Sequence, residues 1–294
     1  MRTENRMVRT VLISSVLLMA LFVIGCGSGD QQTLQKNYKL GYALPALVID
    51  EQRSPTVFYE NRPFSLVLTL FNRAGYPLQN VRVTLANYDQ TFLSIANPQQ
   101  FFPQIEENNA YNDDNGGRVD MVFTGDVLDL HGAEERREPY RLYASYDSKM
   151  EFAPTICVNA ARYDVFDAGC QMPKSKVSFS GQGAPLAVTS LEEIVLSGDV
   201  AELELRLRLE NKGNGDIKNI RLGQARLGNT PLACQFKDVL ENADKSVSFK
   251  SNRKDGEILC TATLVEKSSY QTALFIEFFY SYELSVARQM TIKR

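Results

Sequence analysis

Few residues of this chain have the types and spacing that catalysis requires. The single histidine, His131, falls in an expected loop, where Asp126, Asp129 and Glu134 are close enough in sequence to orient its ring. A histidine that activates a nucleophile also needs a serine or cysteine in a recognisable motif, and we find none. We therefore expect a chain that is not an enzyme. A surface hydrolase with a shallow site near His131 is the alternative.

A segment rich in Asp and Asn is the best candidate for a metal site. Residues 112–117 read NDDNGG, so Asp113, Asp114 and the following Asp120 could supply carboxylate oxygens to calcium. No carboxylate stands at the closing position of an EF-hand loop, and the same residue types dominate ordinary turns. We expect no cofactor. Calcium at residues 112–120, in a calcium-dependent adhesin, is the alternative.

Residues 274–282 (LFIEFFYSY) carry the clearest signal for an interaction surface. Alternate residues from Leu274 to Tyr282 should face the core of a sheet. Phe275 and Phe279 then lie on the other face beside Glu277, where two exposed rings would form a partner-binding patch. The alternative is that a loop or another domain covers them. We identify no small-molecule substrate, and the lack of tryptophan weakens a carbohydrate-binding interpretation.

The N-terminus is typical of an export signal. Three arginines precede an apolar run at residues 11–24, which is shorter than the roughly 20 residues of a membrane span. The run ends at Val23-Ile24-Gly25-Cys26, which resembles the lipobox of prokaryotic membrane lipoproteins. That resemblance implies a diacylglyceryl group on Cys26, cleavage before it, and attachment to the cell membrane on the extracytoplasmic side.

Lipid anchoring has a simple physical basis. Each buried CH₂ contributes about 0.8 kcal/mol, so two acyl chains hold a protein at a membrane for long times. The alternatives are an uncleaved N-terminal anchor helix and an ordinary signal peptide with a chance cysteine. Removal of residues 1–25 takes away three Arg and one Glu, which changes the net charge from −3 to −5. Such a mildly acidic chain is a poor candidate for binding nucleic acid.

The other four cysteines, Cys157, Cys170, Cys234 and Cys260, indicate disulfides in an exported chain. Three pairings are possible. We favour Cys157–Cys170 and Cys234–Cys260, because each bond then stays within one expected domain. Each would close a short loop and stabilise the fold by about 3–4 kcal/mol. No Cys-x-x-Cys motif accompanies the lone histidine, so the ligand spacing of a zinc site is absent.

Alternation with a period of two dominates after residue 40 and predicts β-strands. Residues 64–71 and 81–85 form two such runs, joined by a loop. In residues 203–209 leucines alternate with Glu and Arg, which predicts one buried and one solvated face. Asp255-Gly256 is an expected hairpin turn. Further strands are expected at 46–52, 118–124, 139–147, 152–158, 186–196, 217–222, 245–250, 257–265, 271–283 and 285–292.

The two blocks of strands repeat one pattern. The strand at 64–71 leads to NRAG and then to Asn80-Val81-Arg82-Val83, and the strand at 200–209 leads to NKGN and then to Asn219-Ile220-Arg221-Leu222. This resembles the immunoglobulin-like, adhesion-type modules of prokaryotic surface proteins, and implies an all-β fold of two tandem immunoglobulin-like β-sandwich domains. Many short antiparallel strands with regular turns favour the same architecture.

The expected organisation follows from composition. We expect a signal peptide at 1–25, a flexible tether at 26–39, β-sandwich domains at 40–172 and 186–294, and a linker rich in Lys, Ser and Gly at 173–185. Segments at 157–170 and 181–185 are also similar to uncharacterised archaeal surface proteins, a likeness that implies no activity.

The function that we expect is that of a lipid-anchored cell-surface protein with a structural or binding role. It would present its sandwiches to a protein partner of the envelope or the exterior. An edge strand would be the natural place to pair with a strand of that partner. Membership of a larger envelope or secretion assembly is a further alternative.

Overall fold

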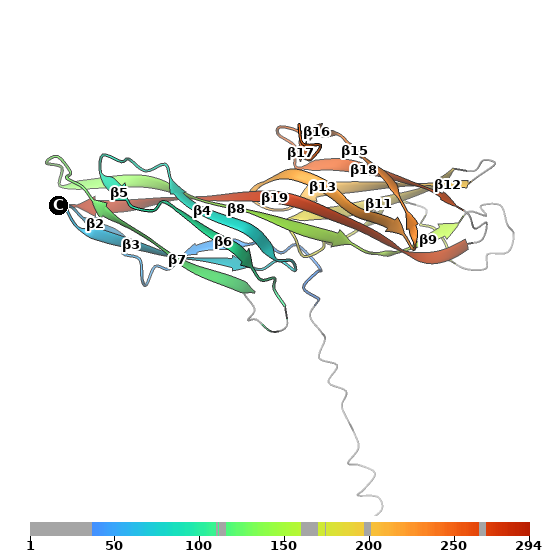
Figure 1. Ribbon diagram of the computed structural model, residues 1–294, viewed down its shortest axis with the longest axis horizontal. Helices are drawn as coiled ribbons and strands as arrows, with labels where there is room; N and C mark the ends of the chain where they lie inside the picture. The colour runs from blue at the N-terminus through green and yellow to red at the C-terminus, as the bar shows by residue number, and fades with distance from the viewer. Residues whose placement is uncertain are drawn as a thin grey trace, which may run out of the picture. The chain divides into compact units, whose positions relative to one another are not determined.

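The computed structural model describes residues 37–109, 111, 116–159, 170–173, 175–196, 201–264 and 269–294. All regular elements within these ranges are β-strands, which confirms the all-β prediction, and the strands form three sheets (Figure 1). The signal peptide, Cys26, Asp113 and Asp114 lie outside the described residues.

Two smaller sheets have matching strand orders. One is β1-β3-β7-β5, and the other is β11-β12-β18-β15 with β10 beside β11. This is the A-B-E-D order of one sheet of an immunoglobulin sandwich. The strands are β1 (Ala46–Ile49), β3 (Pro63–Asn72), β5 (Leu93–Ile95), β7 (Gly117–Val127), β10 (Val177–Ser178), β11 (Leu186–Leu196), β12 (Ala201–Asn211), β15 (Ala233–Lys237) and β18 (Asp255–Leu264).

The third sheet has 10 strands and contains strands from both blocks of the sequence. Its main order is β16-β17-β13-β19-β8-β4-β6, while β14 pairs with β13, and both β2 and β9 pair with β19. The strands are β2 (Val57–Tyr59), β4 (Leu78–Ala86), β6 (Gln99–Ile105), β8 (Glu135–Phe152), β9 (Thr155–Asn159), β13 (Asp216–Leu227), β14 (Thr230–Pro231), β16 (Val239–Glu241), β17 (Val247–Phe249) and β19 (Ser269–Lys293).

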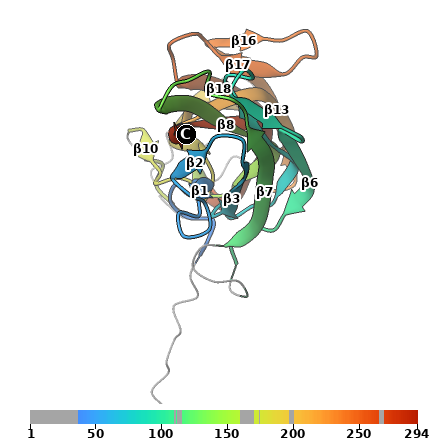
Figure 2. The ribbon, with the colours of Figure 1, turned by 90° about the vertical axis from the view of Figure 1, so that its left-hand side faces the viewer.

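Two long neighbouring strands, β8 and β19, hold the third sheet together. They pair antiparallel from Ile276↔Phe152 to Lys293↔Glu135 without a shift of register, and the ladder continues onto β9 beyond Pro154. In Figure 1, β19 (red) extends from β9 and β13 to the C-terminus. In Figure 2 the C-terminus lies beside β2, which pairs parallel with the last residues of β19.

The long strands are exchanged between the two halves of the fold. We call residues 37–152 the first half and residues 155–294 the second half. In an immunoglobulin sandwich, strand G lies beside strand F in the sheet that contains C, F and G. In the first half, β8 is strand F and pairs with β4, while β19 occupies the position of strand G. In the second half, β19 is strand F and pairs with β13, while β8 occupies the position of strand G. The domain division at 173–185 stays a prediction, and strand pairing crosses it.

The core lies between the third sheet and the two smaller ones. Leu203, Leu205, Leu207 and Leu209 on β12 are all 0% exposed, as their alternation with charged residues predicts. Even-numbered residues of β8 and β19, such as Leu142 and Phe278, face the same core. Burial of each such side chain stabilises the fold by about 1.5–3 kcal/mol. We call the opposite face of the third sheet its outer face.

Two details of the strand prediction are wrong. Residues 271–292 form one strand, not two, because no Gly, Pro or Asn interrupts them. Asp255-Gly256 lies inside β18, and the preceding turn is formed instead at residues 250–254, where Arg253 N–H donates to Lys250 O and Asn252 has φ 65°.

Candidate partner-binding surface

A polar cluster lies at the centre of the outer face. Asp147 on β8 and Ser281 on β19 are direct partners in the ladder, and Ser281 Oγ donates to Asp147 Oδ1 (2.8 Å). Asn80 Nδ2 donates to Asp147 Oδ2 (2.9 Å), and Asn219 Nδ2 donates to Ser281 Oγ (3.4 Å). These four side chains connect β4, β8, β19 and β13 in one row.

Both asparagines of this cluster lie in β-bulges. Asn80 and Asn219 each have φ 53°, a left-handed conformation that asparagine adopts more readily than most residues. The strand register shifts around each of them, between Gln79 and Arg82 and between Lys218 and Arg221. The bulges turn the two amides toward the central pair. The repeated Asn-apolar-Arg-apolar pattern was the signal in the sequence, although it did not reveal a bulge.

The cluster lies on a local two-fold relation between the halves. Gln79 pairs with Asp147, and Lys218 pairs with Ser281, so Asp147 and Ser281 hold equivalent positions. Because these two residues are also each other's partners, the two-fold relation passes between them. The repeat seen in the sequence is therefore a repeat of the structure.

A groove with a volume of about 330 Å³ lies beside the cluster. Phe279 lines it with a side chain that is 44% exposed, between its cross-strand neighbours Arg221 on β13 and Lys149 on β8. The remaining lining residues are Pro77, Gln79, Asp147, Ser148, Asn219, Tyr280 and Ser281. The groove thus offers an exposed aromatic ring surrounded by polar side chains.

The cations beside Phe279 are already neutralised. Lys149 Nζ bonds Glu151 (2.8 Å) and Glu277 (3.2 Å), and the bond to Glu151 is the main reason that the pKa of Lys149 is raised. Arg221 pairs with Asp244 at 2.7 Å. Hydrogen bonds from Ser246 first and Arg221 second lower the pKa of Asp244 to about 2. Since these charges are satisfied internally, the groove favours apolar contact over capture of a free anion.

Phe275 lies on the same outer face as Phe279, but it differs in exposure. Its ring is half-buried, and the guanidinium of Arg226 lies 5.0 Å from the ring centre. Glu277 lies between the two phenylalanines along β19 and is engaged by Lys149. Of the two predicted partner-binding rings, Phe279 is the one that lines the groove.

His131 lies in an exposed turn away from the groove-lining residues. It has φ 55°, its main-chain N–H donates to Asp129 Oδ1 (2.5 Å), and its Nδ1 is 3.7 Å from the same oxygen. Phe92 contacts its ring edge-on at 6.0 Å between centres. Asp129 thus accompanies His131 as expected, and no hydroxyl or thiol is among the contacts of the histidine within the described part of the chain.

Asp120 is the one predicted calcium ligand that the structure describes. It lies on β7, where Thr69 Oγ1 donates to its Oδ1 (2.5 Å). Within the described ranges, no group of three or more His, Cys, Asp or Glu residues could hold a metal ion. Residues 112–115 of the expected calcium loop at 112–120 lie outside the described residues, so calcium binding there stays a prediction.

Both favoured disulfides are present. Cys157 on β9 bonds Cys170 with the Cα atoms 5.7 Å apart. Cys234 and Cys260 are direct partners in the β15–β18 ladder, with Cα atoms 4.0 Å apart. The second bond therefore fastens the edge strand β15 to the five-stranded sheet.

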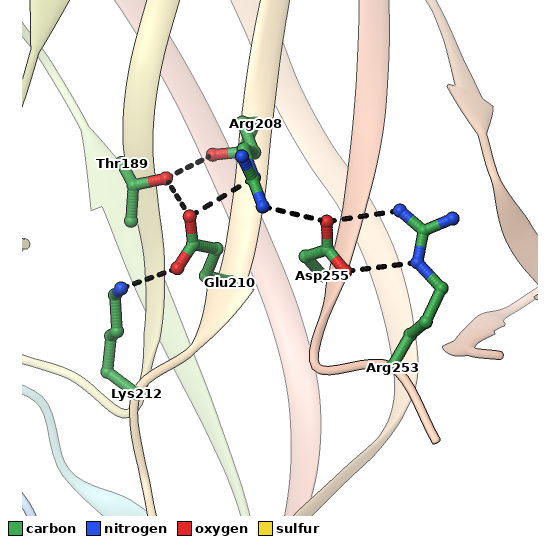
Figure 3. Close-up of polar contacts among 6 residues, drawn as sticks. All are labelled: Thr189, Arg208, Glu210, Lys212, Arg253 and Asp255. Carbon is green, nitrogen blue, oxygen red and sulfur yellow. Dashed lines mark hydrogen bonds and ion pairs between the residues drawn. The ribbon is translucent and has the colours of Figure 1, made fainter. Parts of the chain in front are cut away.

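The outer face of that smaller sheet carries charges that pair with one another (Figure 3). Arg208 lies between Glu210 and Asp255, at 3.2 and 3.1 Å. A hydrogen bond from Arg253 is the main reason that the pKa of Asp255 is lowered. Burial alone would raise the pKa of Glu210, but hydrogen bonds from Lys212 and Thr189 and the nearby cations lower it. This face is internally satisfied and offers little to a partner.

Sequence reasoning missed Glu193. Register places it opposite Leu205, so this carboxylate lies on the core face of β11. Its Oε2 is buried without a hydrogen-bond partner among the described residues, and burial raises its pKa to about 7. The signal was the alternation itself, because Leu191, Glu193 and Val195 share one face.

No protein-family model and no curated protein matches the chain. Solved structures with weak similarity include the C-terminal domain of the Streptococcus pyogenes antigen I/II-family protein AspA, with 10% identity, 86% of this chain and 100% of that chain covered, and a TM-score of 0.17. The C-terminal domain of the Streptococcus agalactiae AgI/II polypeptide BspA has 10% sequence identity and a TM-score of 0.15. The match covers 85% of this chain and 100% of that chain. A third structure is the Enterococcus faecalis MSCRAMM ACE, described as binding its ligands by the collagen hug model. It has 9% sequence identity and a TM-score of 0.14, and the match covers 88% of this chain and 98% of that chain. TM-scores of this size carry no argument about function.

Proposed function

We propose that this chain is an exported, lipid-anchored cell-surface protein that binds a protein partner through the outer face of its ten-stranded sheet. The exposed ring of Phe279 in the groove carries this proposal. Aromatic side chains contribute much of the energy of protein interfaces, above all where polar groups surround them. The neighbouring ion pairs are complete without a partner, so apolar contact dominates.

The two disulfides support export. Such bonds form and persist outside the reducing cytosol, and both pairs have the close Cα spacing that a disulfide needs. In the described part of the chain, no helix is long and apolar enough to cross a membrane. We assign anchoring to a lipid on Cys26, in line with the lipobox at residues 23–26.

Location is tested in native cells. We expect metabolic labelling with a fatty acid to mark the wild-type protein and to miss Cys26→Ser, which should be released from the membrane fraction. External protease should degrade the wild type in intact cells or in cells stripped of an outer envelope. Unlabelled protein that remains in the cytosol would contradict export and anchoring together.

Partner binding through the groove is tested by cross-linking in native membranes. We expect Phe279→Ala to lose cross-linked species that the wild type forms. Phe101→Ala is the matched control, because Phe101 on β6 is 57% exposed but does not line the groove. Equal loss in both variants, or none in either, would remove Phe279 from the partner site.

A further inference from the structure

The strand β19 has an open edge over residues 284–290. On the side away from β8, β13 pairs with β19 only as far as Glu283, and β2 pairs with it only from Thr291. Between these partners, no strand of the described residues pairs with that side. The opening is a gap in an otherwise paired strand, not the free end of a sheet.

Three residues direct their main-chain groups into this gap. Thr291 N–H donates to Thr56 O (3.4 Å), and Lys293 O accepts from Glu60 N–H (2.8 Å). The main-chain N–H and C=O groups of odd-numbered residues in this part of β19 therefore point away from β8. Main-chain groups alternate sides along a strand. The residues that offer N–H and C=O groups to the gap are therefore Ser285, Ala287 and Gln289. All three are exposed.

The equivalent edge in the second half is closed. Glu151 lies four residues beyond Asp147, as Ser285 lies four residues beyond Ser281, so the local two-fold relates Glu151 to Ser285. Glu151 N–H donates to Tyr76 Oη (3.1 Å), and Lys39 Nζ bonds the Glu151 carboxylate (2.8 Å). Side chains cover this edge in one half and leave it open in the other.

Two arginines beside the gap have no carboxylate partner among the described residues. Arg288 Nη1 donates to the carbonyl of Ala287 (3.0 Å), which is one of the gap acceptors. Arg141 on β8, opposite Ala287, donates to Ser285 Oγ (3.3 Å). On the outer face of β12, by contrast, Arg206 and Arg208 are both bound by carboxylates. Both guanidinium groups beside the gap can therefore bind a carboxylate of a partner.

The two boundaries of the gap select what enters it. A second copy of this chain would bring its own long β19 and neighbouring strands, which would collide with β13 and β2. A short extended segment that leaves the sheet at both ends avoids this collision. At about 3.4 Å per residue, such a segment has roughly the length of the gap, which is five to seven residues.

We propose that residues 284–290 bind a short, acidic, extended segment of a partner protein as an added β-strand. A main-chain N–H of the added segment would replace Arg288 as the donor to the Ala287 carbonyl. The released guanidinium of Arg288 would then bind a carboxylate of the segment. A small pocket of about 140 Å³ lies at the β2 end of the gap, and its lining includes Thr56, Arg288 and Gln289. This inference rests on the proposed partner-binding function and names the class of partner.

The direct test uses purified protein and synthetic peptides. The probe is a capped seven-residue peptide of Val and Thr with two adjacent central glutamates, so that one glutamate faces each side of the sheet. Its counterpart carries two lysines instead. We expect hydrogen exchange to show slower exchange at Ser285, Ala287 and Gln289 only with the glutamate peptide. Leu284 and Val286, whose N–H groups face β8, should stay protected throughout.

Two variants separate the charge from the backbone. Arg288→Gln should weaken binding of the glutamate peptide about tenfold, since one charged pair is lost. Ala287→Pro removes an N–H that has no hydrogen-bond partner among the described residues, and proline is tolerated at open edges. We expect this variant to melt like the wild type and to bind the peptide at least tenfold more weakly.

Each remaining outcome overturns the inference. No protection of the three amides at millimolar peptide removes the strand site, and equal binding of the lysine peptide removes the acidic class. Protection that grows with protein concentration alone, together with dimers in sedimentation, assigns the gap to a second copy. These measurements use soluble protein, so their failure leaves the tests of lipid anchoring and of Phe279 unaffected.

Discussion

Glu193 makes the stability of the protein depend on pH. Its pKa is raised from an ordinary 4.5 to about 7 by burial beside Leu205, so the folded protein holds a proton that the unfolded chain releases between these values. Stability is therefore fully present below pH 4.5 and falls as the pH rises to about 7. After a discount for partial exposure, we expect the loss to be about 2 kcal/mol.

Replacement of Glu193 provides the measurement. Glu193→Gln should flatten this part of the pH profile of the free energy of unfolding, measured with urea at pH 4.5–7.5. Glu192→Gln is the matched control, because Glu192 lies on the outer face opposite Arg206. A slope that survives in Glu193→Gln would show that another group titrates.

Calcium is tested at the level of single carboxylates. If the folded protein binds calcium with a Kd of about 1 mM, roughly 10 mM calcium would raise its free energy of unfolding by about 1.4 kcal/mol. Because Asp120 already accepts a hydrogen bond from Thr69, we expect the melting temperature to be the same in calcium and in chelator. A rise in calcium that disappears in Asp113→Asn or Asp114→Asn would instead establish the adhesin alternative.

Among the elements, β15 depends most directly on a covalent bond. Loss of the Cys234–Cys260 bond in a double serine variant should lower the free energy of unfolding by about 3.5 kcal/mol. The Cys157–Cys170 bond closes a loop half as long, with a sequence separation of 13 against 26. Its removal should cost about 0.6 kcal/mol less, because loop entropy grows only with the logarithm of length.

Urea denaturation of both double variants checks this ranking. Equal losses would mean that strain or residual structure, not loop length, sets the contribution of each bond. A larger loss from the shorter loop would reverse our assignment of the more important bond.

How much of the fold the sequence predicts differs between elements. Alternation located the strand around Leu205 and its buried face, and the expected division into two domains favoured both disulfides. Short strands such as β5 and β6 were missed, because three to seven residues with mixed polarity give little periodic signal. The exchange of β8 and β19 was also missed. Since the two halves have similar patterns, periodicity does not say which half supplies strand G.

The candidate site divides in the same way. Phe279 followed from its face on a strand, whereas the groove depends on bulges at Asn80 and Asn219 that bring separate strands together. The open edge at Ala287 could not be predicted at all. It arises from where β13 and β2 end, which is a property of pairing between distant segments.

For the whole molecule, exchange of the long strands makes each half depend on the other. A truncation that removes residues 284–294 leaves the β19 side of β8 unpaired over residues 135–144 and removes the partner of β2. We expect this truncated protein to aggregate, because a long exposed edge pairs with other chains. Light scattering and gel filtration report the change.

Addition of the missing strand provides the control. A synthetic peptide of residues 284–294, present during refolding, should restore soluble monomer by completing the sheet. Removal of Arg294 alone should have no effect, since it lies outside β19. A soluble, cooperatively unfolding truncation without the peptide would show that the first half is complete by itself.

The position of β19 in the chain also determines the order of assembly. Ribosomes deliver the first half early, but the strand that completes its sheet is synthesised only after nearly all of the second half. The β19 side of β8 in the first half therefore stays unpaired while the remainder of the chain is made. If the chain is exported as proposed, late completion of this sheet suits a secretion route that keeps polypeptides unfolded during translocation. It also suits chaperones that bind the exposed strand edge after translocation.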